Sequence, residues 1–192
     1  SMSRAKRIDR QQKPAATRED WITMALVMLR ERGVDGIKVV TIAKRLGLTS
    51  GSFYWHFENV QDLLNEVLSY WEHHLTDDII TAARNFSGPP EERILDLMLQ
   101  VIQEDATMYD QAIAVWANSN KAARTVYRRT IKKRFQFAQW MFEQVGFPED
   151  DARTRGRLFV TALMGESSSN LKADPQWEQI IKREHALLTA RY

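Results

Sequence analysis

The stretch from Thr41 to Phe57, TIAKRLGLTSGSFYWHF, decides the fold of this chain. Ile42 and Leu46 lie four residues apart, on one apolar face of a first short helix. Gly47 follows at once, and glycine just past a helix end can take the left-handed conformation that closes the last turn. Thr49 then offers a hydroxyl that can cap a second helix. The stretch therefore predicts two short helices joined by a tight turn.

The second helix of this pair carries groups that suit DNA. Phe53 and Phe57, four residues apart, can face inward together. The remaining polar and aromatic side chains are then left for the other surfaces: Ser50, Ser52, Tyr54, Trp55 and His56. This is the layout of a helix-turn-helix, whose second helix enters the major groove of DNA.

Leu46-Gly47-Leu48-Thr49, followed by GSFYWHF over residues 51–57, resembles the DNA-binding signature of the tetracycline-repressor (TetR) family. The Tyr-x-His-Phe ending is the most diagnostic part of the resemblance, which is close over about residues 18 to 65. It implies an all-α fold, with an N-terminal three-helix helix-turn-helix DNA-binding domain. A larger C-terminal helical domain would serve ligand binding and dimerisation.

The chain departs from the family pattern in two places. Lys38, Val39 and Val40 stand where the family usually has threonine near the start of the first motif helix. Val60 stands where the family usually has a lysine that holds a phosphate. A valine can still touch a thymine methyl group. Both departures fall on residues expected to touch DNA and leave the predicted fold unchanged.

Composition suits one large or two small domains, since the chain has 192 residues of which 44% are hydrophobic. There is no cysteine, which excludes a disulfide framework and a thiolate metal site. No apolar segment follows the basic N-terminal residues, so we expect no signal peptide. The expected location is the bacterial cytoplasm, at the nucleoid, with no membrane partner.

The net charge of +2 hides an asymmetry along the chain. Residues 1–57 hold eleven Lys and Arg against five Asp and Glu, a balance of +6, and the remainder, with sixteen against twenty, has −4. Basic residues without periodicity over 1–16 predict a flexible arm, which either reaches along DNA or only solubilises the chain. A basic module on a mildly acidic body suits polyanion binding at one end.

Periodicity and chain breakers predict helices throughout. After the arm (1–16), a helix-turn-helix domain is expected over 17–64 and a larger helical domain over 65–192. The helices outside the motif are expected over about 17–32, 59–86, 91–108, 110–116, 121–145, 150–171 and 174–192. In the last of these, Asp174 is expected to cap a helix that starts at Pro175.

The DNA-binding residues are assigned partly by position on the motif and partly by the family resemblance. They are Lys38, Val40, Lys44, Thr49, Ser50, Gly51, Ser52, Tyr54, Trp55 and His56. By the resemblance, Tyr54 and His56 bond phosphates and Trp55 packs against sugar or a thymine methyl group. The alternatives are a capping or packing role for His56, and solvated charges for Lys44 and for Arg45, which could also hold a flanking phosphate.

Enzyme chemistry is not expected, because the chain has neither a phosphate-cradling glycine loop nor a serine nucleophile elbow. His73 and Asp77 are four residues apart and could meet, but two ligands alone make a poor metal site. We therefore expect no metal and no cofactor.

The family resemblance implies a ligand cavity among the central helices of the larger domain. Its expected lining combines bulky apolar side chains with polar ones that could orient a ligand: Trp71, Met98, Gln103, Trp116, Asn118, Tyr127, Trp140, Phe159 and Glu166. Plain core packing is the alternative for each of them, since interiors are normally filled. A mostly apolar effector is predicted.

The two final helices are expected to pair with those of a second copy. They carry the apolar residues Leu158, Val160, Ala162, Leu163, Ile180, Ile181, Leu187 and Leu188. A two-fold homodimer suits a palindromic double-stranded operator. The interpretation is a ligand-responsive transcriptional repressor. The alternatives are a DNA-binding regulator without a small-molecule ligand, and a helical enzyme or carrier with an incidental helix-turn-helix.

Overall fold

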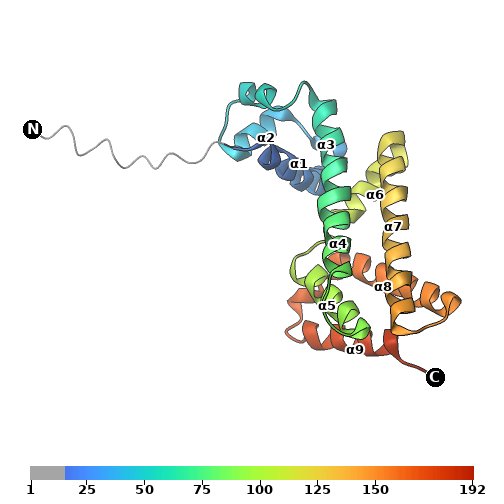
Figure 1. Cartoon of the computed structure of the whole chain (residues 1–192). Helices are drawn as coiled ribbons and strands as arrows, with labels where there is room; N and C mark the ends of the chain where they lie inside the picture. The colour runs from blue at the N-terminus through green and yellow to red at the C-terminus, as the bar shows by residue number, and fades with distance from the viewer. Residues whose placement is uncertain (1–15) are drawn as a thin grey trace, which may run out of the picture.

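The computed structural model describes residues 16–192, which fold into helices and the loops between them (Figure 1). No strand occurs in that range, so the all-α prediction is confirmed. The predicted arm over residues 1–16 lies, apart from its last residue, outside the described residues. No helix among the described residues has the length and apolar character needed to cross a bilayer.

The N-terminal part contains α1 (Arg18–Arg32), a short 3₁₀ turn (Val34–Gly36), α2 (Val39–Leu46) and the 3₁₀ segment η2 (Ser50–Trp55). A continuous rod follows, made of α3 (Val60–Glu72), the π-helical turn η3 (His73–Asp77) and α4 (Asp78–Arg84). The rest of the chain forms α5 (Pro90–Gln103), α6 (Asp110–Ser119), α7 (Lys121–Val145), α8 (Glu149–Ser169), a 3₁₀ turn (Leu171–Ala173) and α9 (Trp177–Thr189). In Figure 1 the rod and α7 run between α1 and α2 at one end and α5, α8 and α9 at the other.

Local sequence explains how the N-terminal helices begin and end. Thr17 and Asp20 form the predicted capping box, because each side chain accepts a hydrogen bond from the other residue's backbone nitrogen, at 3.2 and 2.7 Å. Gly47 closes α2 with φ 71° and ψ 31°, the left-handed conformation that the sequence predicted. Asn59 caps α3 by accepting from the backbone nitrogen of Asp62 at 2.9 Å.

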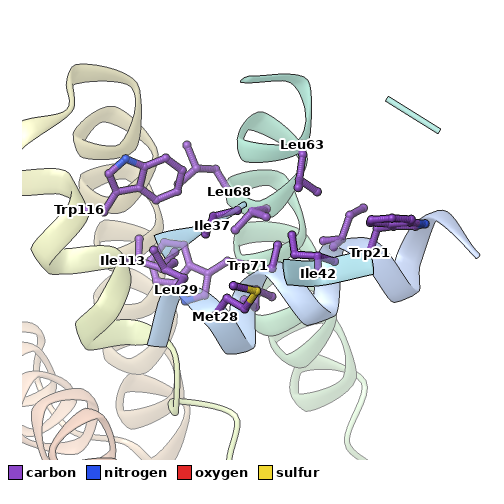
Figure 2. Close-up of a cluster of buried hydrophobic side chains, with 14 of the residues drawn as sticks. Trp21, Met28, Leu29, Ile37, Ile42, Leu63, Leu68, Trp71, Ile113 and Trp116 are labelled. Carbon is purple, nitrogen blue, oxygen red and sulfur yellow. The ribbon is translucent and has the colours of Figure 1, made fainter. Parts of the chain in front are cut away.

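One hydrophobic core joins α1, α2 and η2 to the rod, to α6 and to the start of α7 (Figure 2). Trp21 and Ile42 are fully buried in it, as are Trp71 of the rod and Ile113 of α6. The expected division at residues 64 and 65 therefore crosses a shared core. A shift of the rod or of α6 would be transmitted to α1 through these contacts, because packed interiors resist deformation.

A second core lies where α5, α7, α8 and α9 meet, and it includes Met98, Phe142 and Ile181, all fully buried. Helices α7 and α8 approach closely in it. A Cβ atom added at Gly156 would lie 2.8 Å from the backbone nitrogen of Gln139, so only glycine allows this approach.

The structure corrects several predicted boundaries. Helix α5 ends at Gln103 rather than near residue 108, because Asp105 adopts a left-handed φ of 52° and turns the chain. Helix α9 begins at Trp177, since the Asp174 carboxylate accepts from the backbone nitrogen of Gln176 at 2.8 Å and holds a turn there instead. The rod ends at Arg84, two residues earlier than expected.

Candidate functional site

The segment η2 presents the motif residues on a short 3₁₀ helix rather than on a longer α-helix. Thr49 precedes it but makes no capping hydrogen bond through its side chain, contrary to prediction. The Ser52 hydroxyl instead donates to the Thr49 carbonyl at 2.6 Å. A 3₁₀ helix has three residues per turn, so the segment that carries the aromatic side chains is wound more tightly than an α-helix.

Aromatic packing fixes the inner side of η2. Phe53 is fully buried and Phe57 is 2% exposed, as the sequence predicted. The Phe53 ring lies 5.1 Å from Phe57 in a stacked pair and 5.5 Å from Trp21, edge to face. Such pairs add roughly 0.5–1.5 kcal/mol beyond burial. The segment is therefore held rigidly against α1.

The outer side of η2 is open to solvent. Trp55 is 88% exposed and Tyr54 is 65% exposed, and Val40 of α2 reaches 67%. The other predicted DNA-binding residues are also exposed or half-buried: Lys38, Lys44, Thr49, Ser50, Gly51, Ser52 and His56. We call these ten residues the motif face. Exposed aromatic side chains on a rigid segment are typical of a contact surface.

Arg18 is a further part of this site that the sequence did not single out. Its guanidinium group lies 4.4 Å from the centre of the Phe57 ring and donates to the carbonyl oxygen of His56. It also forms an ion pair with Glu66 of α3 at 3.3 Å. Arg18 thus joins the end of η2 to α1 and to the rod. No local pattern marks it, because its partners lie far away in sequence.

The basic residues of α2 differ in how they are held. Arg45 bonds Glu31 of α1 at 2.7 Å, and this hydrogen bond lowers the pKa of the Glu31 carboxyl below its ordinary value. Lys38 and Lys44 form no ion pair within residues 16–192 and are exposed. The two lysines therefore remain available for phosphate groups.

A buried polar cluster connects the rod to α6 and α7. The Asp110 carboxylate, 2% exposed, accepts from the Trp71 indole nitrogen at 3.0 Å and from Arg134 at 2.6 and 3.0 Å. Arg134 also donates to the Thr76 hydroxyl at 3.0 and 2.9 Å. We call Trp71, Thr76, Asp110 and Arg134 the Asp110–Arg134 cluster. Its bidentate ion pair has the geometry of the strongest such interactions.

A second charged group lies one turn along the rod. Glu72, 2% exposed, accepts from Arg129 at 2.5 and 2.7 Å and pairs with Lys133 at 2.9 Å. The hydrogen bond from Arg129 is the main reason why the pKa of Glu72 falls to about 2. Two residues of α7 thus hold the rod just before its π-helical turn.

A cavity of about 70 Å³ lies between the rod, α5, α7 and α8. Its wall is mostly aliphatic and aromatic, and includes Leu75, Thr76, Ile79, Ile80, Leu97, Val101, Ala106, Thr107, Arg134, Phe137, Phe159, Val160, Leu163 and Met164. Of the nine side chains that the sequence suggested for a pocket, Phe159 lines this cavity.

The other eight side chains lie elsewhere. Trp71, Met98 and Trp116 are packed in the two cores, at 0, 0 and 4% exposure. Tyr127 and Asn118 border an open groove between α6, α7 and α8.

The remaining three suggested side chains lie nearer the surface. Trp140 packs against the guanidinium groups of Arg84 and Arg93, at 4.7 and 5.1 Å. Gln103 is exposed at the end of α5, and Glu166 borders a groove beside it.

The final two helices expose part of the apolar set suggested for dimerisation. Leu158 of α8 is 55% exposed and Leu187 of α9 is 77% exposed. The other members divide between buried ones, which are Val160, Leu163 and Ile181, and half-buried ones, which are Ala162, Ile180 and Leu188. The free apolar surface is thus smaller than the sequence pattern suggested.

The histidine pair on the rod behaves as a surface feature. His73 contacts Asp77 at 2.7 Å, as predicted, and His74 contacts Asp78 at 3.0 Å. No group of three or more metal-ligating side chains occurs in the part of the chain that the structure describes.

Comparison with known proteins places the motif in a family. Residues 22–67 match the model described as bacterial regulatory proteins, tetR family. The HTH-type transcriptional regulator AcrR of Shigella flexneri is 27% identical over 96 residues, which cover 50% of this chain and 45% of that protein. The tetracycline repressor protein class A from transposon 1721 of Escherichia coli is 46% identical over 44 residues, 23% of this chain and 20% of that protein.

These alignments span less than half of either relative. The fold extends further: a TetR transcriptional regulator from Legionella pneumophila superposes with a TM-score of 0.73 at 12% identity, covering 90% of this chain and 97% of that one. All of these proteins are described as regulators or repressors, and none as an enzyme.

Proposed function

We propose that this chain, whose residues 22–67 match the tetR family model, is a transcriptional repressor of that family that binds a palindromic operator as a homodimer and responds to a small-molecule effector. The observation that carries the proposal is the exposed Tyr54–Trp55 pair on a rigidly packed η2. A solvent-facing indole beside the exposed Lys38 and Lys44 suits a contact surface for DNA. The proposed site of action of the protein is the bacterial cytoplasm, at the nucleoid.

The motif face divides its work between phosphates and bases. The Tyr54 hydroxyl and the His56 ring bond phosphates, which fix orientation without reading sequence. Ser50 and Ser52 lie at the start of η2, where short hydroxyl side chains reach base edges. Trp55 packs against sugar or a thymine methyl group. Lys38 and Lys44 contribute sequence-independent attraction.

The two departures from the family pattern fit this division. Val40 is 67% exposed beside η2, so it suits contact with a thymine methyl group. Val60 is the first residue of α3 and is 36% exposed. Its side chain has no charged group with which to bind a phosphate. Phosphate binding therefore depends more on Tyr54, His56 and the lysines of α2.

Dimerisation through α8 and α9 is supported by the exposed Leu158 and Leu187. A stable interface buries at least about 1,000 Å² in total. A two-fold dimer places two motif faces on successive major grooves of a palindrome.

The effector response is supported by the cavity beside the Asp110–Arg134 cluster. Thr76 and Arg134 belong to both, so a ligand in the cavity pushes on the contacts that hold the rod to α6. A ligand shifts DNA affinity only if it binds one state better than the other. The competing proposal is a DNA-binding regulator without a small-molecule effector, in which no ligand occupies the cavity.

The test starts from duplexes selected out of a random library by the full-length protein. Tyr54→Phe and His56→Ala should each weaken binding at least about tenfold on every selected sequence, because a hydrogen bond to a charged group contributes roughly 1.5–3 kcal/mol. Ser50→Ala should change the selected sequence instead. Tyr192→Ala, which alters a fully exposed tyrosine at the other end of the chain, serves as the control.

Affinity would be measured by fluorescence anisotropy at one fixed salt concentration, since phosphate contacts depend on salt. Folded Tyr54→Phe and His56→Ala proteins that bind as tightly as the parent would contradict the assignment of the motif face.

A further inference from the structure

The wall of the cavity near residue 134 has an unusual balance of groups. Eleven of its fourteen side chains are apolar, and the polar members are Thr76, Thr107 and Arg134. No carboxylate belongs to the wall. Arg134 is thus the single charged group that a ligand meets there, and it is only 12% exposed.

Each of these polar groups is already bonded within the protein. The Thr107 hydroxyl donates to the Leu163 carbonyl at 3.2 Å. The Arg134 guanidinium binds both carboxylate oxygens of Asp110, at 2.6 and 3.0 Å, and donates to Thr76 through two nitrogens. The charge of Arg134 is therefore neutralised by a partner outside the wall, and the wall offers a ligand no free charge.

We propose that the cavity binds a compact, uncharged and largely apolar molecule, about the size of one small ring. The proposal rests on the effector response proposed above and specifies the chemistry of that effector. An anionic ligand would bring a second negative charge to an arginine that Asp110 already satisfies. It would lose its hydration without a new partner, a cost of several kcal/mol per buried ion. A cationic ligand would meet Arg134 and no carboxylate.

The size follows from the volume. A cavity of roughly 150 Å³ lined by aliphatic and aromatic side chains holds benzene, and one water needs roughly 10–15 Å³. The present cavity has a volume of about 70 Å³, about half that of the benzene-binding cavity. Met164 lies half-buried in its wall, and a flexible thioether side chain adapts to a ligand at low cost. We therefore infer a ligand with a single six-membered ring and at most a small substituent, for which a shift of Met164 makes room.

Three cyclohexane derivatives separate the possibilities, because they share one ring and differ in charge: cyclohexanol, cyclohexanecarboxylate and cyclohexylammonium. Each would be titrated into the full-length protein by calorimetry and by ligand-observed NMR. Saturable binding is expected for cyclohexanol, with the two ions at least tenfold weaker. Equal or tighter binding of the carboxylate would overturn the proposal, as would failure of all three to bind.

Two substitutions locate the binding. Val101→Leu fills the cavity and should weaken cyclohexanol binding at least fivefold, whereas Val145→Leu should not. The two valines are matched, since both are 8% exposed in the same core and only Val101 lines the cavity. If Val101→Leu does not fold, Ala106→Val against Ala83→Val repeats the comparison at two alanines that are each 7% exposed. Unchanged binding in the cavity variants would overturn the assignment.

Operator binding by the unliganded protein is measured on the same preparations. If the protein binds no operator, the proposed function is contradicted but the ligand class is not. If it binds the operator and no cyclohexane derivative, the ligand class is contradicted but the DNA-binding function is not.

Discussion

The motif face keeps its aromatic side chains in solvent, whereas the Asp110–Arg134 cluster keeps its polar groups buried and bonded. Trp55 is 88% exposed, but Asp110 is 2% exposed with three hydrogen bonds at 3.0 Å or less. Large apolar groups in water and charged groups in a core both oppose the usual distribution of side chains. The exposed aromatic side chains of the motif face do not stabilise the fold, so they are suited to binding a partner. The buried polar groups of the cluster stabilise the fold only while each group remains paired.

The contrast predicts that the same kind of substitution has different consequences in the two regions. In the cluster, loss of one group leaves another uncompensated, so stability should fall steeply. On the motif face, stability should hardly change, while DNA affinity should fall.

The largest effect is expected for Asp110→Ala. It leaves the Arg134 guanidinium, 12% exposed, without its carboxylate, and removal of one partner from a buried pair costs about 3–5 kcal/mol. Urea unfolding followed by circular dichroism measures this. Asp78→Ala is the matched control, because Asp78 is an exposed carboxylate whose contact is with His74. A loss below about 1 kcal/mol for Asp110→Ala would show that the cluster is not tightly coupled.

A smaller loss of stability is expected when acid protonates the Glu72 carboxylate. The folded pKa, about 2, lies below the ordinary 4.5 mainly because Arg129 donates to this carboxylate. The resulting stability is therefore complete above pH 4.5 and is lost as the pH falls from 4.5 toward 2. Since Arg129 is 55% exposed, solvent screens the pair, and we expect about 1–2 kcal/mol. Unfolding free energies at several pH values should show this slope, and Glu72→Gln should flatten it.

An intermediate effect is expected at Arg18, which supports the motif face from α1. Arg18→Gln removes the donor to the His56 carbonyl and the cation over the Phe57 ring. Because Arg18 is exposed, the stability loss should be about 1 kcal/mol or less. Operator affinity should fall about tenfold, since η2 is then less well ordered before binding. Arg30→Gln, on an exposed arginine at the other end of α1, is the control. Equal affinities for both variants would remove Arg18 from the site.

The local structure around the motif face was predictable because its signals are local. Gly47, Phe53 and Asn59 lie within thirteen residues of one another, and each has the conformation or burial that its type and spacing predicted. The order of helices followed for the same reason, and the bounds of α7 agree with the expectation.

The cavity was not predictable, because it depends on how distant helices meet. The sequence suggested bulky residues such as Trp71 and Met98, but these fill the cores. The cavity lies instead where short side chains such as Ala106 and Thr107 leave space beside the rod. Arg134 was also missed, since its partners Thr76 and Asp110 lie 58 and 24 residues away.

The smallest change in stability is expected for Trp55→Ala, and it gives the sharpest form of the comparison. An indole that is 88% exposed contributes little to folding, so the free energy of unfolding should change by less than about 0.5 kcal/mol. Operator affinity should nevertheless fall, because the ring loses its contact with sugar or base. Trp71→Phe, at a fully buried indole that donates to Asp110, should do the opposite and cost mainly stability. Parallel unfolding and anisotropy measurements on the two variants test this directly. If Trp55→Ala lost stability and kept its affinity, the motif face would be a packing surface, and the contrast between the two regions would not hold.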